Sequence, residues 1–163
     1  MKRCTFAVFA LTVATLVWAA DTKVADPEVA YPEGYRHWHH VKSMVINQGH
    51  PLHGAFGGIH HLYANAKAVA GYPSGQFADG AVIVFDLLEA QAADNAITEG
   101  ARKVVGVMQK DAKKFAATGG WGFEGFAAGD RSKRVVGADA ASACFACHAP
   151  QKEHDFVFSR PRD

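Results

Sequence analysis

The feature that most constrains this chain is the pentapeptide Cys144-Phe145-Ala146-Cys147-His148 near its C-terminal end. Two cysteines separated by two residues and followed directly by histidine are the attachment signature of c-type haem. Each thiol forms a thioether with a haem vinyl group, and the adjacent imidazole reaches the iron as its axial ligand. We therefore predict one covalent haem c on Cys144 and Cys147, with His148 as the ligand to iron.

Three other uses of the cysteine pair stay open: a redox dithiol of thioredoxin type, half of a zinc site, or an ordinary disulfide. A thioredoxin-type motif belongs early in a βαβ unit, whereas this motif lies close to the end of the chain. A zinc site needs two further ligands at matching spacing. The remaining cysteine, Cys4, falls in a segment expected to be removed, so the mature chain has both of its cysteines in this motif.

Residues 1–20 are typical of a secretory signal peptide. Lys2 and Arg3 give a positive end, an apolar run reaches Trp18, and Ala19-Ala20 offers a small-residue cleavage site. The apolar run is shorter than the roughly 20 residues that span a bilayer, so we expect no membrane span after cleavage. Because bacterial haem c is attached outside the inner membrane, we predict a periplasmic protein.

The rest of the chain is expected to form a single domain. Residues 21–34 are polar and contain Pro27 and Pro32, so they are interpreted as an N-terminal arm, and residues 35–163 as the haem c domain.

The chain has 17 Lys and Arg against 16 Asp and Glu, and its formal net charge is +1. Without a basic run, we expect no nucleic-acid partner.

Short β-rich segments broken by glycine indicate an α+β fold with an antiparallel β-sheet and a few short helices. The predicted strands cover residues 41–46, 56–63, 81–85, 102–110, 121–126 and 156–158. Short helices are predicted at 35–38 and 65–70, and loops at 47–54 and 90–99. A C-terminal helix from Ala140 to His148, capped by Asp139, is predicted to carry the haem motif. The long amphipathic helices of a four-helix cytochrome do not fit this pattern.

Beyond the haem motif, the chain resembles the cytochrome P-460 family, which includes the cytochromes called c′-beta. The matching segments are, in order, Tyr35-Arg36-His37-Trp38, residues 56–65, residues 75–84, Lys113-Lys114-Phe115-Ala116, Trp121-Gly122-Phe123, the haem motif and residues 155–158. The resemblance implies a periplasmic haem c protein built on an antiparallel sheet. It also implies a homodimer and five-coordinate iron, with histidine below and an open pocket above.

The resemblance implies two functions. The P-460 enzymes oxidise hydroxylamine, whereas the c′-beta members bind nitric oxide and carbon monoxide in a phenylalanine-lined pocket. The hydroxylamine-oxidising members carry a lysine, bonded to the haem edge, a few residues before a Gly-x-Phe-x-Asp-Gly turn. Here Gly71-Tyr72-Pro73-Ser74 precedes that turn, and the nearest upstream lysine is Lys67. The sequence therefore favours a protein that binds nitric oxide or a similar small ligand over a hydroxylamine-oxidising enzyme. An electron-transfer cytochrome c is the second alternative.

Three residues outside the haem motif are candidates for the site. Phe56 and Phe77 lie in segments that match the family, and either can line the distal face of the haem or belong to the core. Glu124 is a candidate general base for a nitrogen substrate. By strand alternation it points away from Trp121 and Phe123, and a solvent-facing glutamate is the alternative.

The histidines are concentrated in one part of the chain, since seven of the nine fall between residues 37 and 61. They show no metal-ligand spacing beyond neighbouring pairs, so we interpret them as surface or core residues. One of them, or Met44 or Met108, remains a candidate for a sixth haem ligand. The seven are His37, His39, His40, His50, His53, His60 and His61.

Overall fold

The computed structural model of the protein describes residues 28–160 and Arg162. The predicted signal peptide and the first part of the predicted arm lie outside the described residues. Within the described part of the chain, we find no helix with the length and apolar character needed to cross a membrane.

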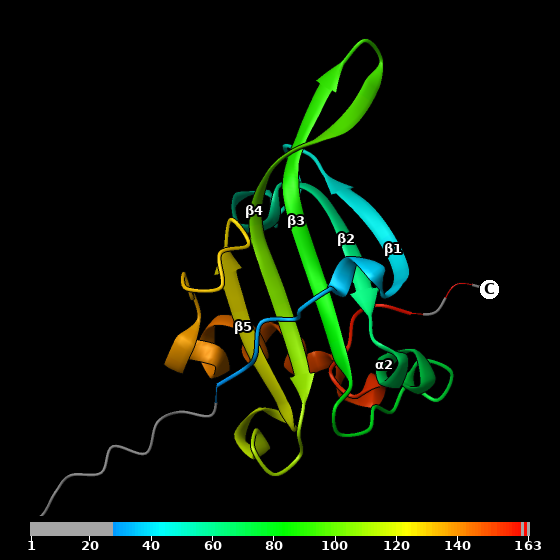
Figure 1. Cartoon of the computed structure of the whole chain (residues 1–163), viewed down its shortest axis with the longest axis vertical. Helices are drawn as coiled ribbons and strands as arrows, with labels where there is room; N and C mark the ends of the chain where they lie inside the picture. Colours follow the sequence, from blue (N-terminus) through cyan, green and yellow to red (C-terminus); the bar gives the residue numbers. More distant parts are fainter. Residues whose placement is uncertain (1–27, 161, 163) are drawn as a thin grey trace, which may run out of the picture.

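A five-stranded antiparallel sheet in the order β1-β2-β3-β4-β5 forms the centre of the domain (Figure 1). Each strand pairs with the next along the chain, so the sheet is a meander, which confirms the predicted α+β class with an antiparallel sheet. The strands are β1 (His39–Ile46), β2 (Gly58–Ala64), β3 (Val82–Ala93), β4 (Ala96–Lys110) and β5 (Trp121–Ala127).

The β3–β4 hairpin is longer than predicted, because residues 90–99 are not a loop but the end of a two-stranded ribbon. Ala93 pairs with Ala96. Between them, Asp94 and Asn95 have φ of 50° and 60°. Two positive φ values in a two-residue turn match the right-handed twist of a hairpin, and Asp and Asn tolerate this conformation. The ribbon projects beyond the rest of the sheet (Figure 1).

Short helical turns connect the strands and cover the sheet. Asn65 caps α2, since its side chain accepts a hydrogen bond from the backbone N–H of Ala68 at 2.9 Å. The predicted helices at 35–38 and 65–70 are confirmed. The turns are η1 (Tyr35–His37), α1 (His53–Phe56), α2 (Ala66–Gly71), η2 (Ala116–Thr118), η3 (Gly137–Asp139), η4 (Ala141–Phe145), α3 (Ala146–His148) and η5 (Ala149–His154).

Three local predictions are wrong. Phe56 ends α1 instead of starting a strand, because Gly58, with φ of 131°, is where β2 begins. Asp139 does not cap the C-terminal helix: it lies within η3, and the N-cap position of η4 is held by Ala140, whose methyl side chain cannot cap. Residues 156–158 are not a strand, since Phe156 has φ of 65°.

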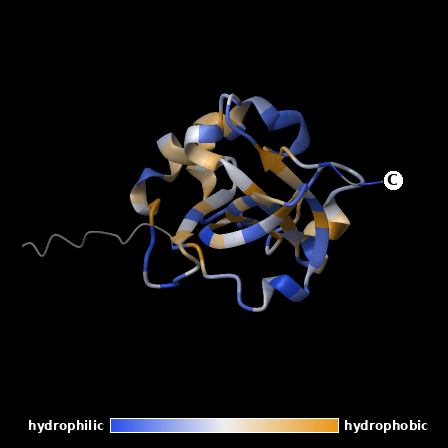
Figure 2. Ribbon diagram, turned by 90° about the horizontal axis from the view of Figure 1, so that it is seen from above, coloured by the Kyte–Doolittle hydropathy of each residue, from blue (hydrophilic) through white to orange (hydrophobic). Residues whose placement is uncertain are grey.

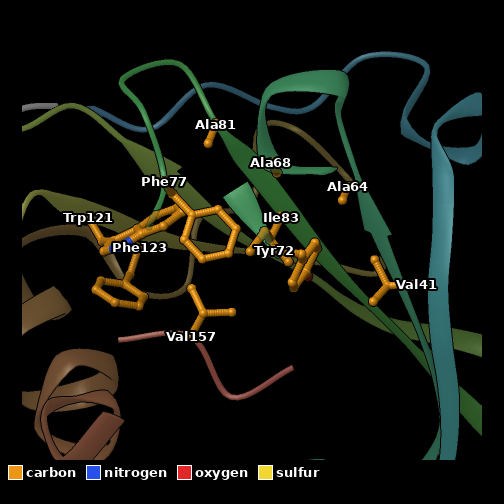
Figure 3. Close-up of a cluster of buried hydrophobic side chains, with 10 residues drawn as sticks. All are labelled: Val41, Ala64, Ala68, Tyr72, Phe77, Ala81, Ile83, Trp121, Phe123 and Val157. Atoms are coloured by element: carbon orange, nitrogen blue, oxygen red, sulfur yellow. The ribbon is translucent and has the colours of Figure 1, made fainter. Parts of the chain in front are cut away.

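Different segments of the chain pack against the two faces of the sheet. Ile83, Met108 and Phe123 lie opposite one another on neighbouring strands and therefore share a face, which the C-terminal segment covers through Val157 (Figure 3). We call this the C-terminal face. The other face, called the N-terminal face, carries Val84, Val105 and Phe126, which pack against Val29 and Tyr35 of the N-terminal segment. Figure 2 shows hydrophobic residues interspersed with hydrophilic ones along the strands.

Candidate functional site

The haem motif lies on the helical run formed by η4 and α3, on the C-terminal face. Cys144 and Cys147 are three residues apart on this run, so both thiols project from one side of it. Both cysteines are free, with Cys144 half-buried and Cys147 exposed. Burial, and then the negative charge of Glu124, raises the pKa of the Cys144 thiol. Two accessible thiols on one side of a helical turn suit a two-point covalent attachment.

The half-buried His148 ring is oriented by a backbone carbonyl. Its Nδ1 lies 2.7 Å from the oxygen of Phe156, so Nδ1–H donates to that carbonyl and the lone pair of Nε2 is left for a metal. The pKa of His148 is lowered from its usual value, because burial outweighs the opposing effect of the hydrogen bond to Phe156. The rings of Phe123 and Phe158 lie 5.0 and 4.9 Å from the imidazole, centroid to centroid.

The Phe156 carbonyl is itself held by a buried group of contacts around Asp155. Asp155 and Phe156 have φ of 51° and 65°, a conformation that non-glycine residues rarely adopt, and it turns this carbonyl back towards His148. The Asp155 carboxylate accepts the backbone N–H of Phe77 at 3.1 Å and Lys110 Nζ at 2.6 Å. The indole N–H of Trp121 donates to the Asp155 carbonyl at 2.7 Å.

The surface of the sheet beside the haem motif is apolar and only partly covered. Phe85 and Met108 on the C-terminal face are half-buried, whereas Val84 and Val105 on the N-terminal face are completely buried. Paired Gly106 and Gly125 add no side chains to this part of the C-terminal face. A half-buried apolar surface on the face that carries Cys144, Cys147 and His148 matches the apolar character of a haem macrocycle, so the chemistry of the residues present fits a haem.

Phe56 and Phe77, the two predicted distal residues, are not brought together. The Phe77 ring lies in the core, 5.2 Å from Tyr72 and 5.5 Å from Trp121 (Figure 3). Phe56, 41 % exposed, instead packs edge-on against Phe85 with 5.7 Å between ring centroids. Sequence reasoning missed Phe85, because its place on the C-terminal face depends on the strand register.

Glu124 is buried on the N-terminal face, opposite Phe123, and its carboxylate has several donors. One oxygen accepts the backbone N–H groups of Gly125 at 2.8 Å and Val136 at 2.9 Å. The other oxygen pairs with Arg134 at 3.2 Å. The Glu124 carboxylate therefore holds the segment that leads into the haem motif, and both of its oxygens already have partners.

Three of the candidate sixth ligands, Met44, His60 and Met108, lie on the C-terminal face. Met108 packs against the same core cluster as Cys144, while Met44 is 49 % exposed on the edge strand. His60 is buried, its ring lies 4.5 Å from that of Phe85, and its Nδ1 has no hydrogen-bond partner. Burial lowers the pKa of His60 to about 4, so its imidazole is neutral at neutral pH.

No lysine occupies the segment before the turn at residues 75–80. The buried Tyr72 hydroxyl hydrogen-bonds with Ser159 Oγ at 2.8 Å. Lys67, the nearest upstream lysine, donates to the carbonyl of Asp79 at 3.0 Å. The side chains of Tyr72 and Lys67 are therefore both engaged in hydrogen bonds within the fold.

Comparison with protein-family models matches residues 32–159 to the model described as Cytochrome P460. No match to a curated protein was found for this chain. The matched range contains all five strands and the helical run with the haem motif. Members of this family are haem proteins and are generally periplasmic. The match covers most of the chain, and the chain therefore belongs to the cytochrome P-460 family.

Proposed function

We propose that this protein is a periplasmic, homodimeric haem c protein whose five-coordinate iron binds nitric oxide or a similar small ligand. The observation that carries the proposal is the half-buried apolar surface on the C-terminal face, which carries the haem motif and also includes Phe85, the partner of Phe56. When bound, the haem supplies an iron coordination position for the ligand. The periplasmic location and the dimer rest on the sequence alone.

Each residue of the site has a defined part in this proposal. Cys144 and Cys147 hold the haem covalently, and His148 presents Nε2 because its Nδ1–H is bound to the Phe156 carbonyl. That hydrogen bond also makes the imidazole a stronger donor to the metal. The apolar side chains of Phe56 and Phe85 disfavour charged and strongly hydrated molecules, since desolvating these costs several kcal/mol, and so favour small neutral ligands.

The spectrum of the protein tests this proposal against its two alternatives. We expect high-spin ferric iron, ferrous iron that binds nitric oxide or carbon monoxide, and an intact mass equal to the chain plus one haem. Hydroxylamine oxidation with an artificial electron acceptor should be negligible, because no lysine is expected to bond to the haem edge. Position 72 is a tyrosine, and Lys67 donates to the Asp79 carbonyl. Brisk hydroxylamine turnover or an additional haem crosslink would establish the enzyme instead. A low-spin spectrum lost in Met108→Leu would establish the electron carrier.

Removing the Phe56 ring should speed ligand entry. In Phe56→Ala we expect carbon monoxide to associate with the ferrous protein about tenfold faster, which corresponds to about 1.4 kcal/mol off the barrier. Phe56 is 41 % exposed, so the fold should tolerate the change. Flash photolysis measures the association rate.

Phe77→Leu is the matched control, because Phe77 is a core residue that is only 6 % exposed. It should lower the free energy of unfolding while leaving the association rate unchanged. If the rate rises in Phe77→Leu but not in Phe56→Ala, the lid is Phe77 and the Phe56–Phe85 assignment is wrong.

A further inference from the structure

Two of the seven clustered histidines meet at the β1 edge of the sheet. Antiparallel pairing places Ser43 of β1 opposite His61 of β2, and His40 lies opposite Tyr63 on the same N-terminal face. His40 Nε2 is 2.9 Å from Ser43 Oγ, and His61 Nδ1 is 2.6 Å from the same oxygen. Two imidazole nitrogens from different strands therefore converge on one point.

A carboxylate lies behind one of these imidazoles. Glu99 Oε1 is 2.8 Å from His61 Nε2, although the N–H direction is not well aligned for a hydrogen bond. The Glu99 side chain is 56 % exposed and can adjust its position. A carboxylate on this side favours a proton on Nε2 and leaves the Nδ1 lone pair directed at Ser43, which is how metal-ligating histidines are commonly oriented.

The surroundings keep these rings suited to metal binding. The His61 side chain is only 15 % exposed, and His40 is half-buried. Burial, and then the positive charge of Arg162, lower the pKa of His40. Imidazole nitrogen is a ligand that zinc and copper favour, whereas calcium and magnesium take oxygen.

We propose that His40 and His61 form a second metal site, which binds zinc or copper(II) and links strand β1 to strand β2. Ser43 Oγ and water complete the coordination. The protein supplies only two histidine ligands, since within residues 28–160 no three His, Cys, Asp or Glu side chains are grouped to hold a metal. The site is on the N-terminal face, whereas the haem motif is on the C-terminal face. It therefore does not depend on the proposed ligand-binding function.

Calorimetric titration of the haem-loaded protein with Zn²⁺ tests the site. We expect one equivalent to bind, with the affinity at least tenfold lower in His40→Ala and in His61→Ala. Glu99→Gln should lower the affinity by about tenfold, as loss of a carboxylate behind a ligating histidine commonly does. Zn²⁺ should also raise the thermal unfolding midpoint of the parent protein but not of the two histidine variants, because an ion bound only to the native state stabilises it.

His39→Ala is the matched control, because His39 is an exposed histidine on the same strand. It should bind Zn²⁺ like the parent protein. The proposal is overturned if the His40→Ala, His61→Ala double variant binds as tightly as the parent, if His39→Ala loses binding equally, or if the parent shows no binding. An unchanged haem spectrum in each variant, together with His40→Gln as a milder change, excludes unfolding as the cause of any loss.

Discussion

Acid-acetone is expected to extract all of the haem from the Cys144→Ala, Cys147→Ala double variant and none from the parent protein. Both thiols are free and project from one side of the η4–α3 run, where they can form the two thioethers. His148 alone then retains the haem only by coordination, which acid breaks by protonating the imidazole. Each single variant should keep the haem through one thioether, with a lower yield of loaded protein.

Ser142→Ala is the control for this experiment, because Ser142 is exposed on the same helical turn and hydrogen-bonds only to the nearby Asp139 carbonyl. It should retain its haem like the parent protein. Haem that resists extraction from the double variant would show another covalent bond. A parent protein without haem, with the two cysteines oxidised to a disulfide, would favour the redox-dithiol or disulfide interpretation.

The central strands could be predicted from the sequence because their signals are local. Residues 81–85 are apolar and include three β-branched residues, glycines and prolines mark the turns around them, and Asn65 is a cap type that precedes a short helix. The haem motif is likewise a local pattern. These features need no knowledge of which segments meet in space.

The parts that were missed depend on tertiary structure. The hairpin at residues 90–99 is exposed on both faces, so it lacks the alternation that indicates a half-buried strand. Phe85 joins Phe56 only through the register of β2 and β3 and the placement of α1. The Phe156 carbonyl reaches His148 through two consecutive positive φ values, and these depend on contacts to distant residues.

Asp155→Ala is expected to lower the free energy of unfolding by about 3–5 kcal/mol, the usual effect of removing one partner of a buried ion pair. The side chains of Asp155 and Lys110 are each 10 % exposed, and 2.6 Å separates Oδ1 from Nζ. The substitution leaves the Lys110 charge buried without its carboxylate, and the Phe77 N–H loses its acceptor. Equilibrium unfolding of the haem-loaded protein in urea measures the loss.

Two further variants separate the buried charge from the other effects of this substitution. Lys110→Met combined with Asp155→Ala should be less destabilised than Asp155→Ala alone, since neither charge then remains unpaired. Arg131→Ala breaks the exposed Arg131–Glu33 pair, whose side chains are 68 % and 63 % exposed, and should cost no more than about 1 kcal/mol. If Asp155→Ala costs no more than Arg131→Ala, the Asp155 contacts do not stabilise the fold. The Phe156 carbonyl would then be held towards His148 by the remaining backbone hydrogen bonds, such as that from the Phe156 N–H to the Gln151 carbonyl.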